Sequence, residues 1–206
     1  VIELGWQNIG PFFGIALIIS AFIFWLIAPK KTYKSDSPPQ KINLFKMAKN
    51  MQVWRFGLYY YFVFGSFLAL IFWLPQYYVS AYQLSPSRAI AFTIAFIVTS
   101  SMARALGGWF SDRYGGRSVN WMVFWVCIVC LFFLSYPPTT MTIHGVDQDV
   151  EIFIEINEWV FSLLIITIGI AQGFGRASIF KTIHEYYPKN MGQIGGFVAG
   201  IGSLGG

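Results

Sequence analysis

A single arginine inside an apolar run constrains this chain more than any other feature. Arg104 lies in the stretch Ser101–Arg117, SMARALGGWFSDRYGGR, which begins with small and apolar residues and ends in a charged turn. On a helix that rises about 1.5 Å per residue, Arg104 lies roughly 12 Å deeper than Asp112. That depth is near the middle of a bilayer core about 30 Å thick, where a guanidinium is costly unless a partner satisfies it.

Long apolar segments separated by charged loops indicate a polytopic, all-α membrane protein. Charged residues make up 11% of the chain and hydrophobic residues 56%, whereas a soluble domain carries about 25% charged residues. Segments of this length cross a bilayer as helices. The predicted spans are 10–28, 56–78, 89–110, 119–136 and 159–187, and a sixth begins over 191–206.

The charges of the loops predict which side of the membrane each loop faces. The connection 29–55 carries seven Lys or Arg residues against one acid, and Arg113 and Arg117 follow the third span. Short loops rich in Lys and Arg stay in the cytoplasm. The loop 137–158 carries five acids and no Lys or Arg, which places it on the outer side.

Both of these loops carry patterns of local structure. Apolar residues at helical spacing from Leu44 to Met51 predict a short amphipathic helix on the membrane surface, with partner binding as the alternative. In the outer loop, apolar residues alternate from Val150 to Ile156 after a polar turn, which predicts a small hairpin. His144 in this loop is expected to be a solvated surface residue rather than a metal ligand.

The charged turn resembles a family motif. Its pattern G-G-x-x-x-D-R-x-G-G-R is similar to the cytoplasmic loop motif of the major facilitator superfamily, and Arg-Ala-Leu-Gly-Gly before it resembles the eighth helix of the nitrate/nitrite porter family. The segment 173–188, GFGRASIFKTIHEYYP, resembles the tenth helix of that family, and the glycine-rich segment 191–206 resembles its second nitrate signature. Together the matching parts cover most of the chain. The outer loop is longer than the family pattern.

The resemblance implies a partial transporter of the superfamily, mainly its C-terminal half. We expect helices six to eleven of twelve: residues 1–28 as the sixth transmembrane helix, 29–55 as a basic cytoplasmic linker, and 56–206 as a truncated C-terminal bundle. Val1 in place of methionine, and an end within an apolar run, also predict a fragment of a longer protein. Its missing partner is the N-terminal half of the same transporter.

Arg104 is the strongest candidate for substrate binding. A guanidinium is planar, always charged, and presents parallel N–H donors to two oxygens. Nitrate and nitrite are small planar anions that match this geometry. The resemblance implies that Arg104 binds the anion together with a second arginine from the missing half. A carboxylate from a missing helix is the alternative partner, because intramembrane charges often pair.

Further site residues follow from the same resemblance. Tyr60 and Phe64 are four residues apart and share a helix face, and the matching aromatic positions of the family line the anion site. Packing against core or lipid is the alternative. Glycines allow close approach of a backbone or a substrate, and we expect this of Gly196, Gly200 and Gly202.

Two basic residues of the fifth span are candidates for an anion path. They are Arg176 and Lys181, and Lys181 lies four residues before Glu185 on the same face. The alternative is that these long side chains reach toward the interface without touching an anion.

Asp112 is expected to need a partner from elsewhere in the fold. An acid at the C-terminal end of its own helix is disfavoured by the helix dipole, so it requires a cation or a neighbouring helix N-terminus. The resemblance implies a salt-bridge latch that holds one conformation closed, and a loop that only sets topology is the alternative. The residues expected in this conformational role are Gly108, Asp112, Arg113, Gly116 and Arg117.

Other motifs do not predict chemistry. Cys127 and Cys130 form a C-x-x-C pair without polar neighbours, which favours apolar packing over a metal or redox site. The pattern G-x-G-x-x-G at 200–205 lacks the preceding strand that a dinucleotide site requires. The net charge of +5 comes from the loops and does not indicate nucleic-acid binding. No metal or cofactor is predicted.

These observations together predict a multi-pass transporter of the inner (cytoplasmic) membrane that moves nitrate, nitrite or both by alternating access. Proton symport and nitrate/nitrite exchange remain open, because no carboxylate lies inside a span. One alternative is a facilitator for another small anion or solute. The other is a membrane-embedded enzyme or anchor subunit, although the sequence lacks the His, Cys or acidic clusters of such enzymes.

The predicted topology can be tested by cysteine labelling. In a protein without Cys127 and Cys130, a cysteine at Asp149 should react with a membrane-impermeant thiol reagent added outside, because the acidic loop faces outward. A cysteine at Ser35, in the basic connection, should not react. The reverse labelling pattern would refute the assignment.

Overall fold

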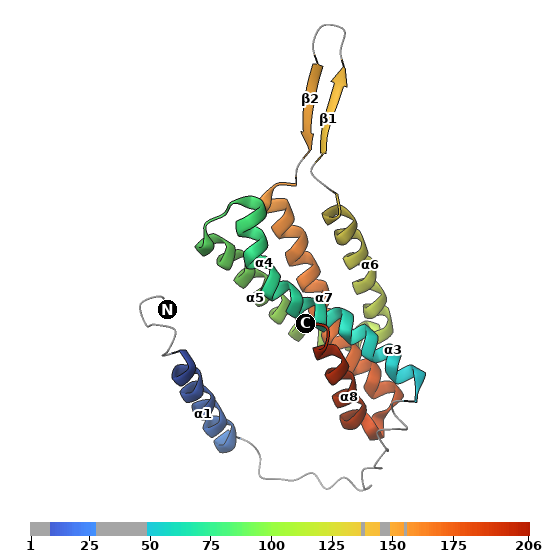
Figure 1. Ribbon diagram of the computed structural model, residues 1–206. Helices are drawn as coiled ribbons and strands as arrows, with labels where there is room; N and C mark the ends of the chain where they lie inside the picture. The colour runs from blue at the N-terminus through green and yellow to red at the C-terminus, as the bar shows by residue number, and fades with distance from the viewer. Residues whose placement is uncertain (1–8, 28–48, 137–138, 145–148, 155) are drawn as a thin grey trace. The chain divides into compact units, whose positions relative to one another are not determined.

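The computed structural model describes residues 9–27, 49–136, 139–144, 149–154 and 156–206 (Figure 1). The chain divides into two units, 1–39 and 40–206. In the first unit, helix α1 spans Ile9–Ile27 and consists almost entirely of apolar residues. This helix agrees with the predicted span 10–28.

The second unit is a bundle of helices with one hairpin. Among the described residues of the whole chain, five helical segments are long and apolar enough to cross a membrane, and they coincide with the five predicted spans. The elements of the second unit are α3 (Met51–Tyr60), η2 (Tyr61–Gly65), α4 (Ser66–Tyr82), α5 (Pro86–Tyr114), α6 (Gly116–Leu134), β1 (Thr139–His144), β2 (Asp149–Ile154), α7 (Glu158–Tyr186), η3 (Pro188–Asn190) and α8 (Met191–Ser203).

The predicted hairpin in the outer loop is confirmed. Strands β1 and β2 pair antiparallel, with Thr139 opposite Ile154 and His144 opposite Asp149. The predicted amphipathic helix lies largely outside the described residues, and Met51, its last residue, belongs to α3.

The second span is longer than the sequence predicted and contains a π turn. It begins at Met51 because Asn50 caps α3, accepting a hydrogen bond from the backbone N–H of Gln52 at 2.9 Å. The wider π-helical turn η2 separates α3 from α4. Such turns are rare and occur frequently at functional sites. The span ends where Gln83 adopts a left-handed conformation with φ of 52°.

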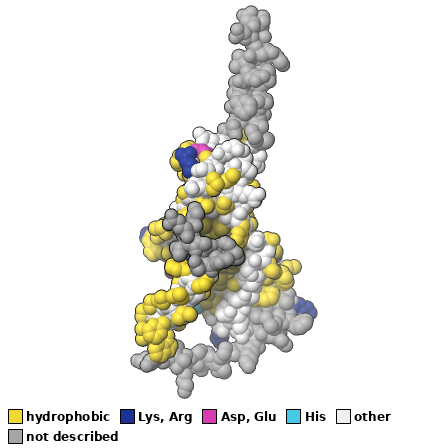
Figure 2. Space-filling model, turned by 60° about the vertical axis from the view of Figure 1, so that its left-hand side comes forward, with side chains coloured by type: hydrophobic (Ala, Val, Ile, Leu, Met, Phe, Trp, Pro, Cys, Tyr) yellow, Lys and Arg dark blue, Asp and Glu magenta, His cyan; other side chains and the backbone are white. Residues whose placement is uncertain are grey.

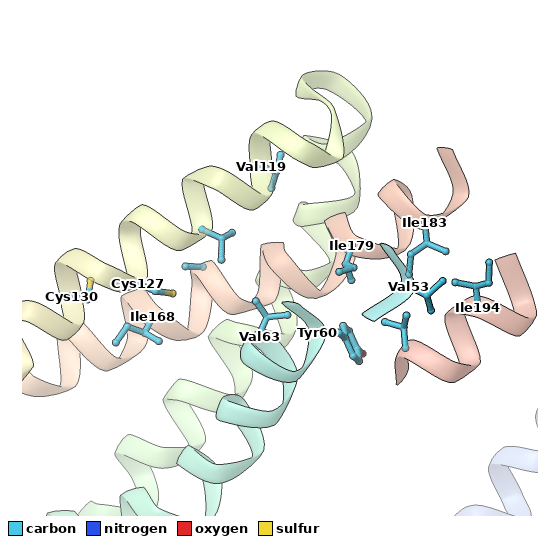
Figure 3. Close-up of a cluster of buried hydrophobic side chains, with 13 residues drawn as sticks. Val53, Tyr60, Val63, Val119, Cys127, Cys130, Ile168, Ile179, Ile183 and Ile194 are labelled. Atoms are coloured by element: carbon cyan, nitrogen blue, oxygen red, sulfur yellow. The ribbon is translucent and has the colours of Figure 1, made fainter. Parts of the chain in front are cut away.

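Helix α7 is the centre of the bundle. It packs most extensively against α5 and α6, and 14 of its 29 residues are buried. Because partners cover it on several sides, it lacks the single apolar stripe of a surface helix. Figure 3 shows one apolar cluster that joins α7 to neighbouring helices, with Val53, Cys127, Ile179 and Ile194 among its members. Both cysteines are free and buried, which confirms their packing role.

Small residues let α5 and α7 approach closely. A Cβ atom at Gly173 would lie 2.5 Å from the carbonyl oxygen of Ser100 and 3.0 Å from the backbone nitrogen of Arg104. At Gly107, a Cβ atom would lie 2.7 Å from the Cα of Phe174. Contacts this close are possible only without a side chain, as at other helix interfaces in membranes. The backbone of α7 therefore lies directly against the turn of α5 that carries Arg104.

The outer surface is apolar. Large hydrophobic side chains such as Met102, Leu106, Trp125 and Leu163 are exposed, and Figure 2 shows broad hydrophobic areas with small patches of charge. A soluble protein does not expose apolar surface on this scale. These side chains suit contact with lipid or with further transmembrane helices.

The contact at Gly173 predicts a stability effect. Gly173→Ala should lower the free energy of unfolding by about 1–3 kcal/mol, the usual cost of overpacking, because the obstructing atoms belong to the backbone of α5. Gly192→Ala is the control, since a Cβ atom there meets nothing within 4 Å. Thermal unfolding of the purified full-length protein in detergent measures both. Equal midpoints for the two variants would contradict the close contact.

Candidate functional site

Arg104 lies on α5 with its side chain exposed. Its neighbour Ala103 and the following Gly107 are buried against α7. Within the described part of the chain, the guanidinium of Arg104 forms no ion pair. The same helix thus holds a buried contact with α7 and, one residue away, an unpaired positive charge.

Arg176 on α7 is buried, with 3% of its side chain exposed. Its Nη2 donates to the carbonyl oxygen of Ser100 at 3.2 Å and to the Ser100 hydroxyl at 2.7 Å. The guanidinium carbon also lies 3.9 Å from the ring centroid of Phe67, a cation–π contact. In the described ranges, Nε has no hydrogen-bond partner and no carboxylate pairs with this arginine.

Ser100 joins Arg176 to the turn of α5 that precedes Arg104. Its hydroxyl donates to the carbonyl of Gly169 on α7 at 2.6 Å, besides accepting from Arg176. Ser100 is four residues before Arg104, so the two lie on the same face of α5, one turn apart. Arg176 therefore holds the helical turn from which Arg104 projects.

The structure brings Tyr60 to the two arginines. Arg104 and Arg176 are close enough for their charges to repel, and the Tyr60 hydroxyl lies within electrostatic reach of both. Tyr60 stacks on Phe64 with ring centroids 5.2 Å apart, so the predicted shared face is confirmed. These aromatic residues lie at the junction of α3 with the π turn η2.

The three predicted glycines of α8 do not behave alike. Gly202 is buried against the ring of Tyr60, and any side chain there would overlap it. Gly196 and Gly200 are exposed, and a Cβ atom at either meets nothing within 4 Å. Gly202 is therefore a packing residue for Tyr60, whereas contact of Gly196 and Gly200 with an anion stays a prediction.

A second polar pair was not anticipated from the sequence. Gln172 is buried and its Nε2 donates to the Ser66 hydroxyl at 2.7 Å, while Ser66 donates to the carbonyl of Phe62. Gln172 Oε1 has no partner in the described structure. The sequence feature that could have indicated this pair is the amide side chain of Gln172 inside an apolar span. Gln172 lies four residues before Arg176 and hence on the same face of the helix.

At the charged turn, the partner of Lys181 is Asp112. Their Nζ and Oδ1 atoms are 2.8 Å apart, which joins the end of α5 to α7. The predicted i,i+4 neighbour Glu185 also acts on the charge of Lys181, but the direct contact of the lysine is with Asp112. The need of Asp112 for a cation from another helix is confirmed.

The remaining residues of the turn differ in their surroundings. Arg113 lies over the rings of Trp109 and Tyr114, at 5.7 and 5.9 Å from their centroids. Gly116 packs tightly on Ser178 and Thr182 of α7. Gly108 has open space around it, and Arg117 is exposed.

An apolar cavity lies elsewhere in the bundle. It has a volume of about 470 Å³ and is lined by residues of α5, α6 and α7 such as Phe110, Met122 and Phe174. Neither Arg104 nor Arg176 lines it. Its apolar wall suits hydrocarbon and not an anion.

Comparisons with known proteins find relatives that are named as transporters. The chain is 32% identical over 203 residues to a probable nitrate/nitrite antiporter, NarK1, of Thermus thermophilus, covering 98% of this chain and 46% of that protein. It is 26% identical to a nitrite extrusion protein of Bacillus subtilis (strain 168), covering 98% and 47%. A probable nitrate transporter, NarT, of Staphylococcus epidermidis is also 26% identical, with 98% and 48% covered.

The chain spans about half the length of these relatives. No solved structure matches it significantly. The family model of the Major Facilitator Superfamily matches residues 1–206. With its apolar helices and this match over its full length, the chain is a multi-pass membrane protein that belongs to the Major Facilitator Superfamily.

Proposed function

We propose that the complete protein transports nitrate, nitrite or both across the cytoplasmic membrane by alternating access. The observation that carries this proposal is the unpaired guanidinium of Arg104 on α5. A charge inside a membrane span is retained where it serves a function, and no carboxylate among the described residues neutralises it. The names of the relatives supply the nature of the anion.

The chemistry of the site fits a small planar oxyanion. The fork of a guanidinium matches two oxygens of nitrate or nitrite, and aromatic rings beside it can contact the faces of such an anion. The hydroxyl of Tyr60 lies within electrostatic reach of Arg104, while the ring of Tyr60 is buried against Phe64 and Gly202. A membrane-embedded enzyme finds no support in the family to which the chain belongs.

The second half of the transporter completes the site in this proposal. The chain covers about half of its relatives, and two halves that rock about a site at the midplane are the basis of alternating access. The missing N-terminal half would contribute a second cation and the opposing surface. Both nitrate/nitrite exchange and proton symport fit this arrangement. Net nitrate uptake into liposomes that contain no nitrate or nitrite distinguishes them, because a pH gradient can drive symport there whereas exchange lacks its counter-substrate.

The charged turn contributes to the conformational cycle. Asp112 and Lys181 tie the end of α5 to α7, so the two helices that carry the arginines move together at that end. Both side chains are well exposed, at 67% and 35%. Exposed ion pairs stabilise a fold by only about 0.2–1 kcal/mol, and the effect of this pair should therefore be on transport more than on stability.

A charge swap tests the pair. Asp112→Lys should slow nitrate counterflow several-fold, because two like charges then meet where α5 ends, and adding Lys181→Asp should restore most of the rate. The free energy of unfolding should change by less than about 1 kcal/mol in the single variants. If the swapped protein is no faster than Asp112→Lys alone, Asp112 acts through another partner.

Counterflow of labelled nitrate in liposomes tests the proposed function, and substitution of Arg104 tests its central residue. Arg104→Lys keeps the charge and loses the planar fork. Loss of about one hydrogen bond to a charged group, worth roughly 1.5–3 kcal/mol, should weaken nitrate binding about ten- to a hundredfold. Arg104→Ala should weaken it further.

The control for this measurement is the amount of each variant that reaches the membrane. Lysine and arginine have similar penalties for insertion into a membrane, so Arg104→Lys should reach the membrane at a near-normal level. Affinities are compared at matched amounts of protein. If Arg104→Lys binds nitrate as the wild type does, a carboxylate partner of Arg104 is the better explanation, and anion recognition lies elsewhere.

A further inference from the structure

We propose that Arg176 is a second, buried positive charge of the anion site, which strengthens anion binding at Arg104 through its field and without touching the anion. This inference rests on the proposed function and deepens it. It assigns Arg176 a role as a positioning and affinity-determining residue rather than as part of a path that the anion follows.

The burial of Arg176 argues against direct contact with a passing anion. Only 3% of its side chain is exposed, and its Nη2 is occupied by the two oxygens of Ser100. Phe67 covers the guanidinium at 3.9 Å. An anion would have to displace these groups to reach it.

The partners of Arg176 are all neutral. A carbonyl, a hydroxyl and an aromatic ring hold the guanidinium by dipoles and by the quadrupole of the ring. None of them cancels its charge, and no carboxylate in the described part of the chain does so. A buried arginine with a purely structural role is normally paired, because an unpaired buried charge costs stability.

The position of Arg176 directs this charge toward Arg104. Ser100, which accepts its hydrogen bonds, lies one turn from Arg104 on α5, and the two guanidinium charges repel one another. An anion at Arg104 would relieve that repulsion. Because charges interact more strongly in a medium of low dielectric constant, the field of Arg176 acts on the anion across the helix contact.

The two arginines therefore have separable roles. Arg104 offers the anion both its charge and its planar fork of donors. Arg176 acts on the anion by its charge alone and donates hydrogen bonds to Ser100 on α5. Lysine should consequently be a poor substitute at 104 and a good substitute at 176. A purely structural role for Arg176 predicts instead that lysine fails there at every pH, because an ammonium lacks the planar group that lies over Phe67 while its Nη2 bonds Ser100.

The experiment measures nitrate affinity of the full-length protein with Arg176→Gln, Arg176→Lys and Arg88→Gln. Arg88 is exposed at the start of α5 and outside the site, so Arg88→Gln controls for loss of one positive charge. We expect Arg176→Gln to weaken binding about tenfold or more, equivalent to roughly 1.4 kcal/mol. Arg88→Gln should match the wild type, as should Arg176→Lys at about pH 6, where lysine is charged.

The pH dependence of Arg176→Lys provides a readout that a structural role does not affect. A buried lysine can lose its proton, whereas arginine cannot. Between about pH 6 and about pH 9, the affinity of Arg176→Lys should fall toward that of Arg176→Gln, while wild type and Arg176→Gln keep parallel profiles. The other ionisable groups around the site, Tyr59, Tyr60 and Arg104, are common to all variants.

The outcomes are distinguishable. If Arg176→Gln binds nitrate as tightly as the wild type, this inference alone is overturned. The same holds if Arg176→Lys binds nitrate equally weakly at every pH. Lack of nitrate binding by the wild type overturns the proposed function as well. The loss of affinity of Arg176→Lys with rising pH can also be measured against the wild type alone, so this comparison remains decisive if Arg176→Gln folds poorly.

Discussion

The close contact between the α7 backbone and one turn of α5 is the constraint on which the site depends. Gly169 and Gly173 remove the side chains that would separate the two helices, and Ser100 fills the contact with hydrogen bonds to both Gly169 and Arg176. Without a close approach, the carbonyl and hydroxyl of Ser100 could not satisfy a buried guanidinium. The packing of small residues and the placement of charge are therefore one and the same feature of the fold.

The buried guanidinium in turn explains the surrounding residue types. A cation in an apolar bundle must either be neutralised or be held by groups that leave its charge intact. Ser100 and Phe67 do the latter, and Gln172, on the same face of α7, adds a second polar layer toward Ser66. The fold is less stable with an arginine at position 176 than it would be with an apolar residue. The proposed anion site explains why a charge is present there.

Much of the fold was predictable because its signals are local. Apolar length identified the spans, alternation identified the hairpin, and depth below the charged turn singled out Arg104. The features that the sequence did not predict depend mainly on contacts between helices. The direct contact of Lys181 with Asp112 was not predicted beside its neighbour Glu185, because spacing along one helix says nothing of the neighbouring helix. The π turn η2 has no periodic pattern in the sequence. The role of Ser100 depends on a close backbone contact between helices, which a single serine in the sequence does not indicate.

The treatment of positive charge changes along α5 and α7. Near the end of α5, Lys181 is neutralised by a carboxylate and Arg113 lies over aromatic rings. Deeper, Arg176 has neutral hydrogen-bond acceptors only, and Arg104 has no partner in the described residues. Counter-charge is thus present at the water interface, where it is least needed, and lacking where the dielectric constant is lowest. An anion drawn to the most positive potential at this depth would move to the Arg104 turn, because Lys181 is paired, Arg113 lies over aromatic rings and Arg176 is buried, whereas Arg88 lies at the far end of α5.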